Sequence, residues 1–235
     1  MVDIIIIVFV FIGGVFGAKK GVIKELVSAI GFVLITVLSF FLKNPLSVLF
    51  YQNLPFFKFG GIFKGVTVLN IALYELIAFL LVFFLLLLLW KLVVVATNII
   101  QKIINMTVIL GFPSKVLGFA IGVLHYYLIS FVVLYILTLP IFSVKMIVYS
   151  NISNYILNRT PIVSSFVKEH DGFIDEFISL KDKYNESSSA YEFNYDTLDL
   201  FLKYDIVDVD GIKKLKEKGK LKIDKIDDLI DKYER

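Results

Sequence analysis

Two ionisable side chains interrupt the apolar stretches of this sequence and are the first candidates for chemistry. Glu75 lies inside residues 65–90, which are otherwise uncharged, and His125 lies inside the uncharged residues 116–144. A charge inside a bilayer costs about 3 kcal/mol on insertion scales, so such residues mark functional sites by default. Together they suggest a polar pathway, as in a small channel or transporter. The alternatives are that Glu75 is interfacial or paired with Lys64, and that His125 forms a hydrogen bond across a helix bundle.

Other kinds of chemistry find little support. The chain has no cysteine, which excludes disulfides and a thiol nucleophile, and its two histidines belong to no catalytic triad or HExxH pattern. Part of a calcium-loop spacing occurs at Asp208, Asp210, Gly211 and Glu217. The first ligand position would be Ile206, so Asp208 and Asp210 are predicted to cap a helix instead. We therefore expect no metal, no cofactor, no small-molecule substrate, no nucleic-acid partner and no enzymatic activity.

The first hinge combines charged and small residues. Residues 16–26 read FGAKKGVIKEL between two apolar runs. This pattern predicts a tight helical hairpin at the membrane surface, with Lys24 and its neighbouring lysines reaching toward the lipid headgroups. Glu25 would lie in the first turn of the second helix, where the helix dipole favours an anion.

Small residues recur at helical spacing on three of the expected helices. Lipid provides no hydrophobic force between helices, so close backbone approach through small residues is the usual means of association. The first, second and fourth apolar helices are therefore predicted to pack through small faces, although glycine is also simply frequent in membrane helices. The predicted packing and hinge residues are Gly13, Gly17, Gly21, Lys24, Glu25, Ser28, Gly31, Gly118 and Gly122.

The elements that position these residues follow from hydropathy. The chain is 58% hydrophobic, its mean hydropathy is +0.83, and its long uncharged runs lie at 4–18, 26–42, 65–90 (with Glu75) and 116–144. A helix needs about 20 apolar residues to cross a bilayer. The fold class predicted is all-α, an integral membrane bundle of about four transmembrane helices with a C-terminal soluble helical tail. The lysines follow the first run rather than precede it, which indicates a membrane helix instead of a signal peptide and an N-terminus outside the cytoplasm.

Charge divides the chain into parts. Residues 1–140 carry nine lysines and three acids, whereas the rest carries fifteen basic and eighteen acidic residues. The predicted parts are a transmembrane four-helix domain at 1–142, an amphipathic helical segment at 143–184 broken at Pro161, a flexible linker at 185–194 and a small polar helical tail at 195–235. Residues 43–64 are expected to form an aromatic-rich interfacial loop. Residues 92–105 are expected to form an amphipathic helix that either extends the third apolar helix out of the lipid or lies separately at the interface. The expected partners are the lipid bilayer and a protein, or a second copy, bound through the membrane helices or the tail, because about forty residues bury little core of their own.

These residues resemble the colicin V production protein family, a group of small bacterial inner-membrane proteins with about four transmembrane helices. The resemblance covers roughly residues 1–165. It is carried by Asp3 at the start of a short first helix, by Gly21, Lys24 and Glu25 as G-x-x-(K/R)-E, by Ser28 and Gly31, and by Gly118 and Gly122 in SKVLGFAIGVLHYYL (114–128). Ser114 and Lys115 stand where the family often has an acidic or polar residue and an arginine. The resemblance implies a role in toxin production or secretion and in envelope homeostasis, in the inner membrane and without enzymatic activity.

Overall fold

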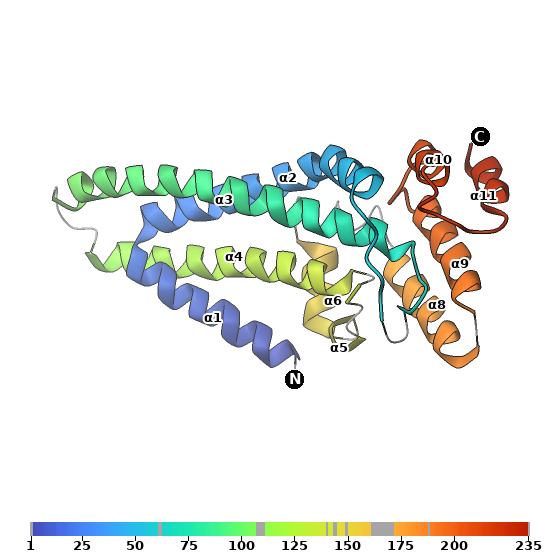
Figure 1. Ribbon diagram of the computed structural model, residues 1–235. Coiled ribbons are helices and arrows are strands. Elements are labelled where there is room, and N and C mark those ends of the chain that lie inside the picture. The colour runs from blue at the N-terminus through green and yellow to red at the C-terminus, as the bar shows by residue number, and fades with distance from the viewer. Residues whose placement is uncertain are drawn as a thin grey trace. The chain divides into compact units, whose positions relative to one another are not determined.

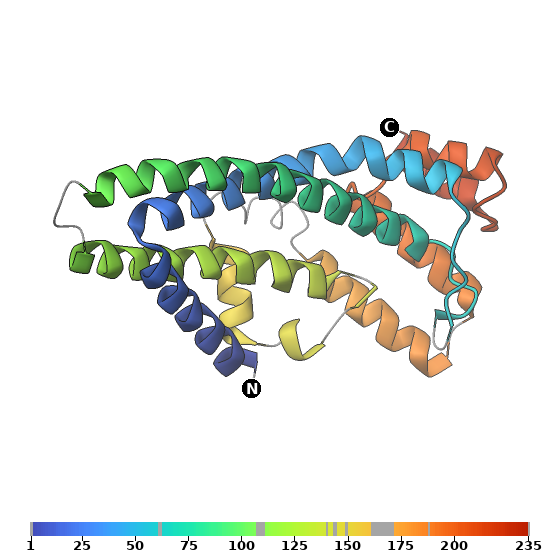
Figure 2. The same cartoon turned by 60° about the vertical axis from the view of Figure 1, so that its left-hand side comes forward.

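The computed structural model is all-helical in the parts of the chain that it describes (Figures 1 and 2). Four helices are long and apolar enough to cross a membrane, namely α1 (Val2–Lys20), α2 (Val22–Asn53), α3 (Leu69–Met106, with a candidate span at Leu69–Val95) and α4 (Gly111–Thr138). The described residues after α4 include the shorter helices α5 (Lys145–Val148), α6 (Asn151–Arg159), α8 (Phe173–Ser187), α9 (Ala190–Lys203), α10 (Val209–Glu217) and α11 (Ile226–Tyr233). The structure describes residues 2–60, 63–106, 111–139, 141–142, 145–148, 150–160, 172–187 and 189–234. The predicted fold class is confirmed.

The long helices carry apolar side chains on the outside. Ile4 is 65% exposed, Phe84 61% and Leu88 66%, whereas Thr36 and Ser39 are buried. Water would not tolerate so much contiguous apolar surface, while lipid requires it. The chain is therefore a membrane protein.

The chain divides into two compact units that differ from the predicted domains. The first comprises Met1–Phe41, Leu80–Leu137 and Val144–Val167, and the second Leu42–Phe79, Thr138–Ser143 and Lys168–Arg235. Both α2 and α3 therefore contribute to each unit. The predicted boundaries at 142, 184 and 194 assumed that sequence neighbours fold together, but the C-terminal helices share a unit with residues 42–79.

A single hydrophobic core explains the second unit. It joins Leu69 and Ile71 at the start of α3 to Leu198 and Phe201 of α9, all with 0% exposure, and it extends into α8, α10 and α11. The C-terminal helices are too short to bury an adequate core alone, as expected. The missing apolar surface comes from the same chain, so the small size of the tail is no longer an argument for an external partner.

Polar contacts attach the C-terminal helices to the ends of α2 and α3. The Asn194 side chain accepts hydrogen bonds from the N–H groups of Thr67 (2.8 Å) and Val68 (3.1 Å), just before α3 begins. Lys220 Nζ donates to the carbonyl oxygens of Tyr51 (2.9 Å) and Leu54 (2.7 Å), where α2 ends. These are the backbone groups that a helix leaves without internal partners. Burial lowers the pKa of Lys220.

Two predicted irregular segments are helical. Residues 43–53 continue α2 through Pro45. Buried side chains of this helical segment, such as Tyr51 (2% exposed), pack in the core of the second unit. Of the predicted linker at 185–194, residues 185–187 belong to α8 and residues 190–194 to α9. Ser189 caps α9 and accepts a hydrogen bond from the Glu192 N–H. Serine favours such caps as much as it favours linkers, so composition alone could not separate the two.

Other predictions have mixed outcomes. Asp208 caps α10, accepting a hydrogen bond from the Gly211 N–H at 2.6 Å, as predicted. Residues 92–105 belong to α3, which runs without interruption to Met106, so the first alternative, an extension of the third apolar helix, agrees with the structure. The predicted break at Pro161 lies outside the described residues. The N-terminus-outside orientation stays a prediction.

Candidate functional site

A glycine forms the turn between α1 and α2. α1 ends at Lys20, and Gly21 has φ +83°, a conformation that other residues rarely adopt. The Gly21 N–H donates to the Gly17 carbonyl oxygen at 3.0 Å, and the Glu25 N–H donates to the Gly21 carbonyl oxygen at 3.1 Å. The chain therefore reverses within one residue, which places Lys20 at the end of one helix and Glu25 in the first turn of the next.

Before this turn, α1 crosses α4 (Figures 1 and 2). Glycines lie on both sides of the contact. A Cβ atom added at Gly17 would lie 2.7 Å from Gly122 Cα and closer still to the Gly118 carbonyl oxygen. One added at Gly118 would lie 2.5 Å from Gly17 O, and one added at Gly13 would overlap the Tyr126 ring. Backbone atoms cannot turn aside as a side chain can. The structure thus brings the predicted glycines of α1 and α4 together, and their role in helix association stays a prediction.

The small residues of α2 have other neighbours. The nearest atoms to a Cβ added at Gly31 would be those of the Trp90 indole, on α3. Ser28 Oγ donates to the Lys24 carbonyl oxygen at 2.9 Å within its own helix. The prediction that α2 packs on α1 and α4 through Gly31 therefore differs from the structure. Spacing shows which residues share a helix face, but not which helix lies opposite.

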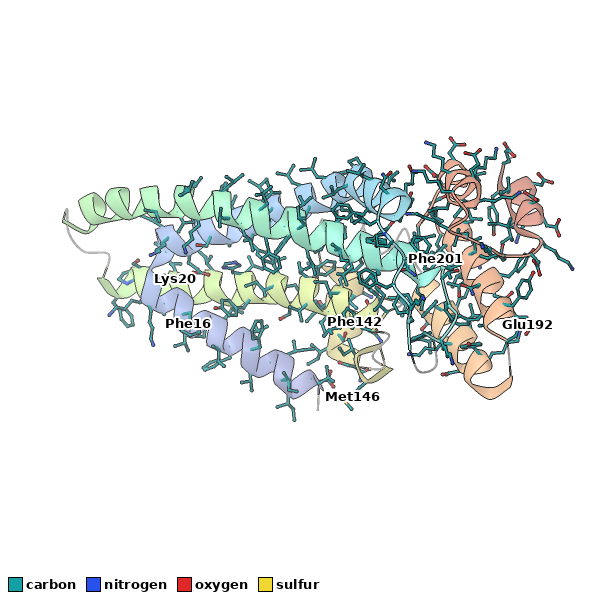
Figure 3. All side chains as sticks on the ribbon, in the orientation of Figure 1. Phe16, Lys20, Phe142, Met146, Glu192 and Phe201 are labelled. Atoms are coloured by element: carbon teal, nitrogen blue, oxygen red, sulfur yellow. The ribbon has the colours of Figure 1, made fainter. Side chains whose placement is uncertain are left out.

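Next to the glycine crossing lies a cluster of ionisable groups from three segments. The Glu25 side chain is 0% exposed, with Oε1 2.6 Å from His125 Nδ1 on α4 and Oε2 2.9 Å from Lys20 Nζ on α1. The His125 side chain is 10% exposed, whereas that of Lys20 is 36% exposed. Figure 3 labels Lys20 at the end of α1. The cluster therefore runs from a partly exposed lysine to a buried carboxylate and a buried imidazole.

Aromatic rings surround the inner end of the cluster. The His125 ring centroid lies 5.4 Å from that of Phe32 and 5.9 Å from that of Tyr126, and Phe32 packs edge-on against Phe83 of α3. A carboxylate in such surroundings requires a nearby positive charge, because its own hydration has been lost. The site places a buried imidazole and a partly exposed ammonium on the two oxygens of one buried carboxylate.

The sequence did not predict this pairing. Glu25 was expected at the membrane surface, and His125 either in a polar pathway with Glu75 or in a hydrogen bond across the helix bundle. The contact of His125 with Glu25 agrees with the second alternative for His125, but the sequence did not name the partner. Gly122 and His125 are three residues apart and share one face of α4. Glu25 lies on α2 beyond the turn at Gly21, so the glycine spacing of α1 and α4 could not place it opposite His125.

Glu75 and His125 lie in different units of the chain. Glu75 lies in the second unit, where its Oε2 accepts a hydrogen bond from Lys43 Nζ at 2.9 Å, and the side chains of Glu75 and Lys43 are 19% and 16% exposed. The partner is not Lys64, since α2 continues through residue 43 and presents Lys43 to α3. The two residues of the predicted polar pathway thus form separate pairs, Glu75 with Lys43 and His125 with Glu25.

Asp3 has a role beyond the predicted start of α1. Its Oδ1 accepts hydrogen bonds from Ser150 Oγ (2.5 Å) and from the Ile152 N–H (3.1 Å), at the first turn of α6. Ser150 is also the N-cap of α6 and accepts from the Ser153 N–H. A carboxylate at a helix N-terminus is favoured by the helix dipole, so Asp3 attaches α6 to α1.

The part of the chain that contains the long apolar helices matches a known protein family. The Colicin V production protein family model matches residues 2–161, which include all four apolar helices. The chain belongs to the colicin V production protein family. It is also 31% identical over 183 residues to the Bacillus subtilis (strain 168) protein named "Uncharacterized transmembrane protein YshB", over 72% of this chain and 96% of that protein. No solved structure gives a significant match.

The family match separates the site from the C-terminal helices. Lys20, Glu25, His125 and the glycines of the α1–α4 crossing all lie within the matched residues of this colicin V production family member, whereas α8 to α11 lie beyond them. Among the described residues, no group of three or more His, Cys, Asp or Glu side chains is placed to hold a metal ion. The chemistry that the cluster can perform is proton exchange and charge pairing.

Proposed function

We propose that this chain is a non-enzymatic, multi-pass protein of the cytoplasmic (inner) membrane. It supports the production or secretion of a bacteriocin-type toxin and the maintenance of the cell envelope. The observation that carries this proposal is the match of residues 2–161 to a family described by colicin V production. The apolar exterior of the long helices supports a role within the bilayer.

The proposed mode of action is binding and organisation. The membrane helices or the exposed faces of the C-terminal helices bind a protein partner or a second copy of the chain. α10 and α11 each bury one apolar face and expose charged side chains on the other, including Lys214, Glu217 and Asp228. Such surfaces suit reversible contacts with a protein of the export process.

The test is deletion of the gene in a toxin-producing strain of its natural host. We expect toxin activity in the culture medium to fall several-fold while activity inside the cells is unchanged or rises, and uptake of an impermeant dye to increase. A plasmid copy of the gene should restore both properties, and the protein should fractionate with inner-membrane markers. Unchanged secretion and unchanged dye uptake in the deletion strain would refute the proposal.

The second candidate is a small channel or transporter subunit, and the buried Lys20–Glu25–His125 cluster favours it because intramembrane ionisable residues mark transport pathways. Purified protein in liposomes should then pass protons or small cations. Glu25→Gln should abolish this flux, whereas the matched variant Glu75→Gln should retain it. Equal flux from protein-free liposomes would reject this candidate.

A further inference from the structure

Glu25 is held by two different cations or potential cations, one on each carboxylate oxygen. Lys20 Nζ lies 2.9 Å from Oε2, and His125 Nδ1 lies 2.6 Å from Oε1. One positive charge is enough to balance a carboxylate. If Lys20 supplies it, His125 is neutral, with its Nδ1–H donating to Glu25 and its Nε2 available for a proton.

A proton added to this cluster creates a charge imbalance. With Lys20, Glu25 and a protonated His125 all charged, the cluster has a net charge of +1 beside the rings of Phe32 and Tyr126. An unbalanced charge in such a place is strongly unfavourable. The imbalance is removed when one cation moves away from Glu25. We expect Lys20 to be that cation, because its side chain is 36% exposed whereas that of His125 is only 10% exposed. A lysine at a helix end can move its ammonium to the headgroups while its methylenes stay in apolar surroundings.

We propose that Glu25 and His125 form a proton-binding site at which a bound proton displaces the Lys20 ammonium. The proton enters from the side of Lys20 and binds the imidazole. The contact between Lys20 Nζ and Glu25 Oε2 then breaks, and the remaining imidazolium–carboxylate pair is neutral overall. Because Lys20 is the last residue of α1, its release loosens the end of α1 at the Gly21 turn.

The side chains that face the Lys20–Glu25–His125 cluster come from all four long helices. α1 presents Lys20, α4 presents His125 with Tyr126 beside it, and Lys24 precedes Glu25 on α2 itself. On the inner side, α2 and α3 present the apolar rings of Phe32 and Phe83 to the imidazole end. The site therefore opens toward Lys20, and it stands on its own geometry whichever of the two functions above is correct.

The first experiment uses the full chain in lipid nanodiscs and the absence of native cysteines. A spin label on Lys19→Cys, an exposed position beside Lys20, reports the mobility of the end of α1 between pH 8 and pH 5. We expect mobility to rise in a single transition as the pH falls. His125→Gln, which keeps a donor for Glu25 but cannot take up the proton, should abolish the transition, and the control Glu75→Gln should leave it unchanged. A missing transition in the unsubstituted cluster, or one that survives His125→Gln, would overturn the proposal.

The second experiment tests the competition and does not depend on the folding of the His125 variant. In a His170→Gln background, His125 is the only histidine, and its imidazole can be titrated by NMR. Lys20→Gln removes the competing cation, so the midpoint should move to higher pH by about one unit or more, an increase of at least about tenfold in proton affinity. A midpoint that is unchanged or lower in Lys20→Gln would show that Lys20 and the proton do not compete, which would overturn the proposal.

Discussion

Glu25 and Glu75 are both carboxylates near the start of long apolar helices, yet their surroundings differ. Glu25 is fully enclosed and contacts a lysine and a histidine from two other segments, whereas Glu75 is 19% exposed and contacts Lys43. The difference arises from the backbone around them. Glu25 lies next to the crossing of α1 and α4, where glycines of the two helices face each other, whereas Glu75 lies in the second unit with Lys43 beside it.

The comparison teaches that an acid in a hydrophobic run acquires its properties from the helices that face it. A partly exposed ion pair such as that of Glu75 with Lys43 contributes little to stability. An enclosed acid with two competing partners can pair with either cation, the ammonium or the protonated imidazole. We expect pH to determine which of these pairs forms. Three predictions can break or sharpen this contrast.

The largest expected effect comes from opening the enclosure of Glu25. Leucine at Gly17 would overlap the Gly118 carbonyl oxygen and Gly122 Cα, which are backbone atoms of α4. We expect Gly17→Leu to cost about 3 kcal/mol or more, the upper part of the overpacking range, and to remove most of the monodisperse protein after detergent extraction. The matched control is Gly111→Leu, because a Cβ at Gly111 has no neighbour within 4 Å. Equal yields and equal unfolding midpoints for the two variants would refute the close-packing argument.

A smaller effect is expected from neutralising each acid. Glu25→Gln leaves Lys20 without its carboxylate and places an amide between two donors in a buried site, so a loss of about 1–3 kcal/mol is expected. Glu75→Gln can still accept from Lys43 near the surface of its unit, and a loss of about 1 kcal/mol or less is expected. Unfolding of both variants by denaturing detergent measures the difference. If Glu75→Gln were the more destabilising, enclosure would not be what distinguishes the two acids.

The sequence predicted those features that depend on composition and local spacing. The four apolar helices, the hinge at Gly21 and the cap at Asp208 each follow from a few neighbouring residues. The pairing of Glu25 with His125 could not be predicted in the same way, because it joins residues 100 positions apart. Helix periodicity gives the face on which each residue lies, and only the tertiary structure shows that Glu25 of α2 meets His125 of α4.

The C-terminal helices show the same limit in another form. Their charge balance indicated a separate soluble tail, and the serines at 187–189 indicated a linker. Neither signal predicted that Asn194 and Lys220 bind backbone groups near the ends of α3 and α2. A single polar residue that binds a distant helix end has no sequence signature, because asparagine and lysine are mostly exposed in folded proteins whether or not they make such a contact.

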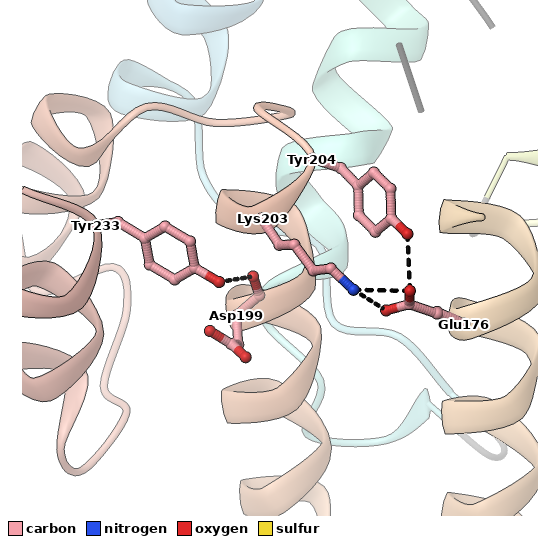
Figure 4. A network of polar contacts seen from close by, with 5 residues as sticks. All are labelled: Glu176, Asp199, Lys203, Tyr204 and Tyr233. Atoms are coloured by element: carbon pink, nitrogen blue, oxygen red, sulfur yellow. Dashed lines mark hydrogen bonds and ion pairs between the residues drawn. The ribbon is translucent and has the colours of Figure 1, made fainter. Parts of the chain in front are cut away.

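The smallest expected effect concerns an acid with no enclosure. Glu176 of α8 accepts hydrogen bonds from Lys203 Nζ (2.7 Å) and the Tyr204 hydroxyl (2.8 Å), and its side chain is 44% exposed (Figure 4). The Lys203 contact, with help from Tyr204, holds the pKa of Glu176 below its ordinary value of 4.5, and the Glu176 contact raises the pKa of Lys203 above 10.5.

A lowered carboxylate pKa stabilises the folded state above the unfolded value and is lost as the pH falls through the folded value, while the raised lysine pKa acts below 10.5. The contact should therefore support α8 and α9 at neutral pH and fade below about pH 4.5. Hydrogen–deuterium exchange should show weaker protection of residues 173–203 in Lys203→Met than in the unsubstituted chain at pH 7, with a smaller difference at pH 4. Because the pair is exposed, the change at pH 7 should be smaller than that caused by Glu75→Gln in its own surroundings. A difference that grows on acidification would contradict the sign, and a large one at pH 7 would show that exposure does not rank these three acids.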